Sequence, residues 1–561
     1  MRIRHILQGM AMGLCMSILG TVAASASGTI NLRGNEYKVD TLYHNIVGPG
    51  TTQTSLLLTR EGSADLRVFY CTIDMTNPLL DLAGVCATDH LAGNERISDM
   101  AVRKSHEGAQ YFVGINGDFF ETGGLTVRGK NRAGSPVGPT VVNGEIFRAK
   151  ADVSVHRSFT QDTDGNLYVN PIAFGGTVTN PQGVSAPLGG VNIGGMNNYV
   201  IIYNHLHYGE TDQTASGWEV ETMVPEGEEY KAAGVFHLVV TGEPSDAGDM
   251  TVPRERYVLR GQGNTASFVQ NLHVGDTLTM NCTWTTSGLS VDPKEVVSGS
   301  PKILENGVTI YTEDERGDAS SLFPRTGLGY SDNGDRVYFL VADGRSSISA
   351  GCRTTVLADI MHYAGATDAV NLDGGGSSIL YTQALGVRNA PSDGYERSDG
   401  NAFYAVHSAP TDSVVASLRF ADYKIETPLY GMYTPRIYAY NQYGVMIDND
   451  VQDFTLSCPD WIGTVSDGQT FMGTSTGTSE LTATLGDVSV TFPVTVLGDI
   501  ENMKLTCDSV LNDTFREWPV IVQNSVDDMV LYLNPAALDW TSSDESVVTI
   551  GANTGVLRGL K

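Results

Sequence analysis

The pattern of hydrophobic and polar positions predicts a chain that is rich in β-strands and poor in helices. Short apolar runs alternate with turn residues over residues 30–110, and residues 66–70 are typical of a strand. Residues 111–115 form a continuous apolar run, which favours a buried strand. Residues 125–300 repeat short alternating runs among Gly, Asn, Thr and Val, and this indicates a β-rich insert.

A strand–helix–strand segment follows the insert. Residues 336–341 are almost continuously apolar and predict a strand. Thr354 or Thr355 is a suitable N-cap for a helix that Gly365 ends, and residues 368–372 predict a second strand. Apolar residues recur at helical spacing between these caps, at Val356, Leu357, Ile360, Met361 and Ala364. The segment therefore predicts a unit similar to a βαβ motif.

The composition and the hydrophobic pattern of the chain change at about residue 413. Helical patterns disappear, and Thr, Ser, Val and Tyr dominate. We expect one immunoglobulin-like β-sandwich over residues 413–497 and a second module, which we expect to be truncated, over residues 498–561. Residues 540–561 resemble the end of bacterial Ig-like group 2 modules. The predicted fold class is an α+β domain with a mixed sheet, few helices and a β-rich insert, followed by all-β immunoglobulin-like sandwich modules.

The N-terminus predicts secretion. Arg2 and Arg4 precede a mostly apolar run over residues 10–24, and Ala24-Ser25-Ala26 is a small-x-small cleavage pattern. Residues 1–26 therefore read as a signal peptide, because the apolar run is too short to span a membrane comfortably and no later run is long enough. We expect a secreted, extracellular protein, which can also be associated with the cell surface.

The net charge limits which partners the protein can bind, and the cysteine content bears on whether it forms disulfides. The formal net charge of −29 argues against a nucleic-acid partner, since Lys and Arg drive such binding. Six cysteines lie outside the signal peptide, and secretion permits disulfides. Cys71 and Cys86 are the most local pair, although six cysteines allow 15 connectivities.

Three of the predicted strands end in an aspartate near glycine: Asp118, Asp343 and Asp373. Ligands of sheets with crossover connections bind beyond the carboxyl ends of the strands, so neighbouring strands would bring these acids together. An Asp-Gly pair is also a common turn, and for a single pair the turn is the better interpretation.

The run "NLDGGGSS", residues 371–378, is the most unusual stretch. No Gly-Lys-Ser/Thr ends it, which excludes a Walker loop, and Ile379 stands where a serine nucleophile elbow needs glycine. Consecutive backbone N–H groups and the hydroxyls of Ser377 and Ser378 suit an anion such as phosphate. Arg325, Arg345 and Arg397 flank the candidate loops and could grip a phosphate, although each alone is equally consistent with a solvated surface cation. Carboxylates beside a phosphate site suggest cleavage of a glycosidic bond at a sugar phosphate.

Four ordered motifs carry a resemblance to a known family. They are "GINGDFF" (114–120), "RTGLGYSDNGDRVYFLVADGR" (325–345), "VLADIMHYAGA" (356–366) and "AVNLDGGGSSILY" (369–381). Together they resemble the phosphodiester glycosidase family over roughly residues 35–408. The resemblance implies a catalytic domain at 30–408 that hydrolyses the bond between a sugar's anomeric carbon and a phosphodiester oxygen. One departure is Ser398, which follows Arg397 where the family often has proline.

The resemblance also implies the site residues and the partners. The catalytic candidates are Asp118, Asp373 and Asp343, with Asp118 and Asp373 preferred. The substrate- and phosphate-binding candidates are Asn116, Arg325, Arg345, Gly374, Gly375, Ser377 and Arg397. We expect a secreted hydrolase for an N-acetylglucosamine-like sugar joined to a phosphodiester or other leaving group, on bacterial or host surface glycans, with cell-wall association through the Ig-like modules. We expect no required cofactor. The sequence does not tell whether a metal is bound, although clustered aspartates would suit a structural calcium ion. The alternative is a non-catalytic glycan-binding surface protein with an Ig-like stalk.

Overall fold

The computed structural model describes residues 28–561 except 124–125, 128–129, 152–155, 212, 311–320, 332, 499–502, 509, 511–512, 527–528 and 553. The expected signal peptide, residues 1–26, lies outside the described residues. No helix within the described part is both long and apolar enough to cross a membrane.

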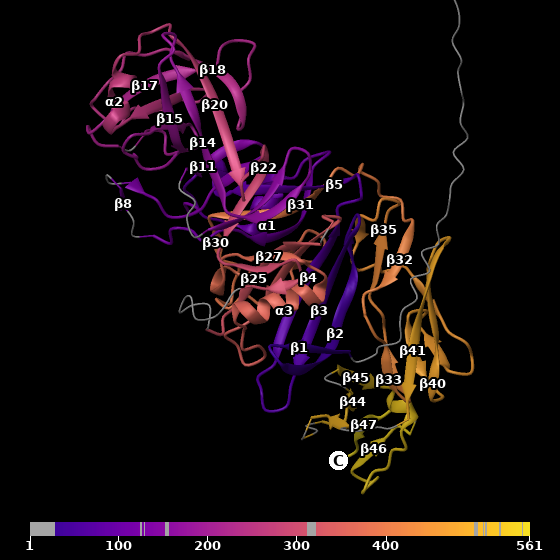
Figure 1. Ribbon diagram of the computed structural model, residues 1–561. Coiled ribbons are helices and arrows are strands. Elements are labelled where there is room, and N and C mark those ends of the chain that lie inside the picture. Colours follow the sequence, from indigo (N-terminus) through magenta and orange to yellow (C-terminus); the bar gives the residue numbers. More distant parts are fainter. Residues whose placement is uncertain are drawn as a thin grey trace, which may run out of the picture.

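A nine-stranded sheet forms the larger layer of the domain that holds the aspartates (Figure 1). Its neighbouring strands pair antiparallel throughout. The strands, in spatial order, are β1 (Gly28–Leu32), β2 (Asn35–Gly48), β3 (Thr51–Thr59), β4 (Leu66–Asp74), β26 (Arg336–Ala342), β25 (Arg325–Tyr330), β27 (Asp368–Asn371), β23 (Lys302–Glu305) and β24 (Val308–Thr309).

A five-stranded sheet packs on one face of the larger sheet. Its strands are β29 (Gly386–Val387), β28 (Leu380–Thr382), β7 (Gln110–Asn116), β31 (Asn401–His407) and β5 (Leu80–Cys86). The alternation of side chains along β26 shows the layering: Phe339 and Val341 join the core shared with the smaller sheet, whereas Leu340 joins the core under helix α3 (Thr354–Ala364). Helix α1 (Ile97–Lys104) packs on the outer face of the smaller sheet.

The predicted strand–helix–strand segment is present as β26, α3 and β27. Strand β25 lies between the two strands and pairs antiparallel with both, so β26 and β27 run parallel and end at the same edge. Gly365 ends the helix with φ 115°, as predicted, whereas the N-cap is Arg353 and neither of the expected threonines.

The prediction of an α+β fold with a mixed sheet is wrong. The protein is 49% strand and 7% helical. The strand–helix–strand segment accounts for the error, because two strands joined by a helix usually run parallel and so predict a mixed sheet. In the structure an antiparallel strand separates the parallel pair, and stacked sheets bury most of the core.

The insert is a second large sheet that closes on itself at one end, the upper part of Figure 1. Strand β15 pairs with β14 on one side and with β16 on the other, which closes a ring of strands around its own core. In spatial order the sheet comprises β13 (Leu167–Asn170), β12 (Arg157–Asp162), β22 (Pro293–Gly299), β10 (Thr140–Val142), β11 (Glu145–Lys150), β15 (Ser185–Val191), β14 (Ile172–Thr179), β20 (Thr277–Thr286), β18 (Gly234–Val240), β17 (Trp218–Met223), β19 (Tyr257–Gly261) and β16 (Val200–Asn204), with β21 (Leu289–Ser290) beside β20. The short helix α2 (Ala266–Gln270) packs against β17 and β19.

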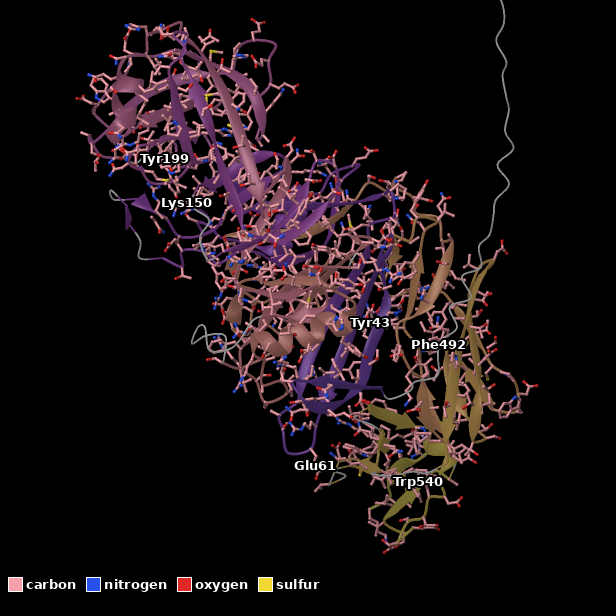
Figure 2. All side chains as sticks on the ribbon, in the orientation of Figure 1. Tyr43, Glu61, Lys150, Tyr199, Phe492 and Trp540 are labelled. Carbon is pink, nitrogen blue, oxygen red and sulfur yellow. The ribbon has the colours of Figure 1, made fainter. Side chains whose placement is uncertain are left out.

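The region after residue 413 is all-β, which agrees with the predicted pattern. Its sheets are β32 (Ser417–Phe420), β35 (Ile437–Tyr440) and β36 (Met446–Asp448); β33 (Glu426–Pro428), β41 (Val488–Leu497), β40 (Gly477–Leu485) and β37 (Thr455–Ser457); β38 (Gly463–Ser466), β39 (Thr470–Gly473), β34 (Gly431–Tyr433), β45 (Met529–Leu533), β44 (Ile521–Val526) and β42 (Lys504–Thr506); and β43 (Glu517–Pro519), β47 (Val556–Gly559) and β46 (Val548–Ile550). Figure 2 shows Tyr43 of β2 close to this region, where it lines a cavity together with Tyr438.

The smaller elements complete the description. Strands β6 (Glu95–Arg96) and β30 (Ser398–Asp399) pair with each other, as do β8 (Thr126–Val127) and β9 (Lys130–Asn131). The 3₁₀ turns are η1 (Ala87–Asp89), η2 (Gly263–Thr265), η4 (Gly375–Ser377) and η5 (Pro535–Ala537). Cys71 and Cys86 lie on β4 and β5, in different sheets, and both are free thiols.

Candidate active site

Asp118 lies just past the end of β7, where Asn401 fixes the backbone. The N–H of Gly117 donates to the Asn401 carbonyl at 3.0 Å, and the N–H of Asp118 donates to Asn401 Oδ1 at 2.9 Å. Gly117 is required here, because an added Cβ would lie 2.4 Å from Asn401 Oδ1. The turn therefore turns Asp118 into the interior of the domain, where it is only 1% exposed.

Only one of the two carboxyl oxygens of Asp118 accepts a hydrogen bond. Its Oδ2 accepts a hydrogen bond of 2.6 Å from the N–H of Gly138, whereas its buried Oδ1 has no hydrogen-bond partner. Burial raises the pKa of Asp118 to about 7, a rise that the Gly138 N–H opposes and the nearby charge of Asp373 increases. At neutral pH this group is therefore able both to hold and to release a proton.

Asn116 joins the end of β7 to the glycine-rich loop. Its Nδ2 donates to the Asp373 carbonyl at 2.8 Å, and its Oδ1 accepts from Thr326 Oγ1 at 2.7 Å. The N–H of Asp373 donates in turn to the Gly117 carbonyl at 3.1 Å. These bonds bring the ends of β7 and β27 together, so the two preferred catalytic candidates, Asp118 and Asp373, are neighbours.

Asp373 begins the glycine loop and is partly exposed. Its Oδ1 accepts from the N–H of Gly374 at 2.8 Å. Burial raises the pKa of Asp373, while the Ser377 hydroxyl, the Gly374 N–H and the charge of Arg397 oppose the rise. Asp373 therefore has solvent access and a donor that favour its charged form, whereas one oxygen of Asp118 is buried without a partner.

The glycines of the loop make room for arginine. Gly375 has φ +65°, which favours glycine, and an added Cβ would lie 3.1 Å from a guanidinium nitrogen of Arg345. A Cβ on Gly376 would lie 2.0 Å from a guanidinium nitrogen of Arg397. The loop therefore passes directly beside two cations, which suits an anionic ligand.

The three arginines are held differently. Arg345 is exposed and its guanidinium lies 4.6 Å from the centre of the Phe323 ring. Arg397 pairs with Asp393 at 2.6 Å and donates to Ser377 Oγ at 3.3 Å. Arg325 is buried and donates to backbone carbonyls, at 3.2 Å to Cys352 and 3.1 Å to Ser321. Arg345 and Arg397 are thus at the loop, while Arg325 supports the segment beneath it.

Asp343, the third predicted acid, has separate partners. Its Oδ1 accepts from Asn389 Nδ2 at 3.1 Å, and both of its oxygens accept from the N–H of Ala390, at 3.2 and 3.1 Å. Asn389 also donates to the Ser378 carbonyl at 2.9 Å. Burial raises the pKa of Asp343 to about 6. Asp343 therefore braces the chain that follows the glycine loop.

Sequence reasoning missed Asp399 and Asn401. Asp399 is 1% exposed and couples electrostatically to Asp373, and Asn401 holds the backbone of Asp118. Asn401 belongs to the stretch "RSDGNA", residues 397–402, which also contains the predicted phosphate ligand Arg397. The Asp-Gly dipeptide at 399–400 resembles the other three acid–glycine pairs, but it does not follow a long apolar run.

Among the residues that the structure describes, no group of three His, Cys, Asp or Glu side chains could hold a metal ion. A cavity of about 570 Å³ is lined by residues that include Arg33, Cys352 and Arg353, with neither Asp118 nor Asp373 in its wall and no carboxylate. We therefore locate the candidate site at the carboxylates, where the chemistry is, and not at this cavity.

Comparison with known proteins gives a family match and several similar structures. Residues 230–406 match the phosphodiester glycosidase family, a segment that includes Asp373 and the three arginines but not β7 with Asp118. No curated protein matches the chain. A Burkholderia pseudomallei protein described as exported is 18% identical with a TM-score of 0.51, and the match covers 68% of this chain and 99% of that one. This likeness shows a shared fold.

Two other structures are more distant in shape. A hypothetical protein from Synechocystis is 18% identical with a TM-score of 0.49 over 64% of this chain, which spans only 62% of that protein's length. The catalytic domain of zebrafish N-acetylglucosamine-1-phosphodiester α-N-acetylglucosaminidase is 11% identical with a TM-score of 0.33, over 66% of this chain and 88% of that one. The resemblance expected from the motifs is confirmed by the family match: residues 230–406 of this chain match the phosphodiester glycosidase family, which supports a glycosidase-type hydrolase.

Proposed function

We propose that this protein is a secreted glycosidase that hydrolyses the bond between the anomeric carbon of an N-acetylglucosamine-like sugar and a phosphodiester oxygen. The observation that carries the proposal is the pair of Asp118 and Asp373 beside a glycine loop that is flanked by Arg345 and Arg397. The phosphodiester glycosidase match over residues 230–406 supports the reaction class. The substrate is a polymer or glycan with sugar-1-phosphate links, on bacterial or host surfaces.

In the net reaction a water oxygen bonds to the anomeric carbon and the bond from that carbon to the phosphate oxygen breaks. One proton of the water stays on the new anomeric hydroxyl, and the other ends on the released phosphate or in solvent. Glycosidases commonly use one carboxylic acid and one carboxylate for such a step. Asp118 is the acid, because burial lets it keep a proton near neutral pH. Asp373 is the carboxylate, because the Gly374 N–H and solvent favour its charge.

The leaving group determines how much the acid matters. A phosphate monoester leaves readily, since its second ionisation lies near pH ~6. Arg345 and Arg397 stabilise the charge that develops on it, as guanidinium groups do for phosphates. Asp118 contributes most when the leaving oxygen is a poor one, such as that of an alcohol.

This division of roles is tested with a leaving-group series. Asp118→Asn is expected to lose about 10²- to 10⁴-fold in kcat/KM on methyl α-N-acetylglucosaminide, which needs the proton. The same variant is expected to keep activity within about tenfold on UDP-N-acetylglucosamine and on the 4-nitrophenyl glycoside, whose leaving groups need little protonation. Asp373→Asn is expected to lose activity on all three substrates.

Two results would contradict the proposal. Equal losses by Asp118→Asn across the series would remove its role as the acid. If the intact protein turns over none of the three substrates but binds N-acetylglucosamine-containing glycans, the glycan-binding alternative replaces the enzyme.

A further inference from the structure

Arg397 is a cation of the candidate site whose backbone is held from outside the glycine loop. Its guanidinium donates to Ser377 Oγ at 3.3 Å and pairs with Asp393 at 2.6 Å. Glu396 and Ser398 are its neighbours on the chain. The position of the guanidinium at the loop therefore depends on what holds these two neighbours.

Both neighbours are attached to the beginning of helix α1. The Ser98 N–H donates to Glu396 Oε1 at 2.8 Å, and the Ser98 hydroxyl donates to Glu396 Oε2 at 2.6 Å. Ser398 pairs with Arg96, the N-cap of α1, whose own side chain makes no capping hydrogen bond. The Glu396 carboxylate therefore caps the helix from another segment, at the end where N–H groups are free and a negative charge is favoured.

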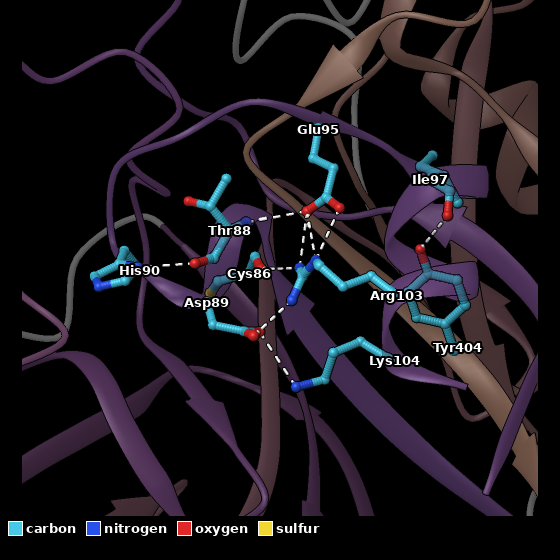
Figure 3. Close-up of polar contacts among 9 residues, drawn as sticks. All are labelled: Cys86, Thr88, Asp89, His90, Glu95, Ile97, Arg103, Lys104 and Tyr404. Carbon is cyan, nitrogen blue, oxygen red and sulfur yellow. Dashed lines mark hydrogen bonds and ion pairs between the residues drawn. The ribbon is translucent and has the colours of Figure 1, made fainter. Parts of the chain in front are cut away.

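Helix α1 is itself a fixed anchor, as Figure 3 shows. The hydroxyl of Tyr404 on β31 donates to the Ile97 carbonyl at 2.6 Å. At the other end of the helix Arg103 binds Glu95 at 2.8 Å and Asp89 at 2.5 Å. The inner face of α1 is buried against the smaller sheet. A contact with this helix therefore fixes the segment that carries Arg397 relative to the rest of the domain.

We propose that Glu396 is a positioning residue that holds Arg397 at the glycine loop by tying its backbone to α1. The inference rests on the proposed function, in which Arg397 stabilises the charge of the phosphate leaving group. Glu396 acts only through Arg397, since both of its oxygens bind Ser98. It thereby contributes to the preference of the site for a phosphate over an uncharged leaving group.

Two substitutions of Glu396 test the contact. Glu396→Ala removes both bonds to Ser98, so it is expected to weaken binding of UDP about tenfold and to lower kcat/KM on UDP-N-acetylglucosamine by a similar factor. Its kcat/KM on the 4-nitrophenyl glycoside, which has no phosphate, is expected to stay within about threefold of wild type. Glu396→Gln can still accept from the Ser98 N–H and donate to its hydroxyl oxygen, so it is expected to bind UDP within about threefold of wild type.

A double-mutant cycle shows whether Glu396 acts through Arg397. Isothermal titration calorimetry with UDP measures Glu396→Ala, Arg397→Ala and the double variant. Adding Glu396→Ala to Arg397→Ala is expected to weaken binding no further, because the guanidinium that Glu396 positions is already absent. A role in the fold alone would give losses that add.

Two further variants probe the same helix end. Ser98→Ala loses only the hydroxyl bond, so it is expected to weaken UDP binding about threefold, and it keeps the test decisive if Glu396→Ala does not fold. Asp99→Ala is the matched control. It removes an exposed carboxylate from the first turn of α1 that pairs with Arg96 at 3.7 Å, and it is expected to leave UDP binding unchanged.

The outcomes separate this inference from the proposed function. Wild-type UDP binding in Glu396→Ala, additive losses in the cycle, or no UDP binding by the wild type would each overturn the inference. UDP binding that depends on Glu396 in a protein that turns over no substrate would support the inference and contradict the proposed function. Turnover of UDP-N-acetylglucosamine with additive losses would do the reverse.

Discussion

At the scale of the residue, Asp118 links activity and stability through one proton. Its folded pKa of about 7 lies above the ordinary value of 3.8, so the folded protein binds more protons than the unfolded chain between these values. The contribution of Asp118 to the free energy of unfolding is therefore fully present below about pH 4 and is lost as the pH rises towards 7. Asp118→Asn removes this loss, since an amide still accepts the Gly138 N–H bond.

We predict that Asp118→Asn is more stable than wild type at pH 7.5, by roughly 1–3 kcal/mol, and no more stable at pH 4. Chemical unfolding at the two pH values measures the difference. Equal stability at both would show that Asp118 is ionised normally and could not serve as the acid. A functional carboxyl group in a buried site usually lowers the stability of the protein. Its replacement is therefore expected to raise stability while activity falls.

The sequence singles out the aspartates at strand ends, whose catalytic roles stay predictions, but not the residues that support them. Asp118 and Asp373 could be predicted because each follows an apolar strand, and apolar runs are visible in the sequence. The same rule also selects Asp343, whose carboxylate accepts hydrogen bonds from Asn389 and Ala390 in the structure. Asp399 could not be found in this way, because its burial depends on a pairing between β30 and β6 that no local pattern reveals.

At the scale of the element, the glycine loop depends on the absence of side chains. A Cβ on Gly376 would lie 2.0 Å from Arg397 Nη2 and 2.4 Å from Asp393 Oδ2, which would break the ion pair that holds Arg397 at Ser377. We predict that Gly376→Ala lowers kcat/KM on UDP-N-acetylglucosamine by about 10- to 100-fold through misplacement of this cation.

The matched control is Gly194→Ala, because nothing lies within 4 Å of a Cβ at that position. Steady-state kinetics of both variants, together with their melting temperatures, separate the site from the fold. Wild-type activity in a folded Gly376→Ala variant would show that the position of Arg397 does not matter.

Elements themselves were predictable, whereas their arrangement was not. The helical period of α3 and its C-cap at Gly365 were clear from the sequence. Nothing local indicated that β25 would enter between β26 and β27, since that pairing joins segments that are not consecutive. The predicted α+β class failed for this reason.

At the scale of the whole molecule, hydrogen bonds tie the C-terminal region to the domain that holds the site. Asn45 of β2 is 3% exposed, and its Nδ2 donates to the Phe420 carbonyl at 2.8 Å. The Tyr440 hydroxyl donates to the Ile46 carbonyl at 2.8 Å. The region is thus docked on β2 through buried hydrogen bonds.

We predict that Asn45→Ala destabilises this docking by about 1–3 kcal/mol, because a buried carbonyl is left without a donor. Scanning calorimetry should then show the C-terminal region unfolding at a lower temperature than in the wild type. Gln442→Ala, which removes an exposed side chain that binds Asp412, serves as the control. An unchanged profile in Asn45→Ala would show that the contact does not couple the two parts.

The most direct test of the account is hydrolysis of UDP-N-acetylglucosamine in water labelled with oxygen-18. Mass spectrometry of the products identifies the bond that breaks. We predict the label on the anomeric hydroxyl of the released sugar, no label in the nucleotide, and loss of the reaction in Asp373→Asn. Label in the phosphate would mean attack at phosphorus, and would contradict a glycosidase built on Asp118 and Asp373.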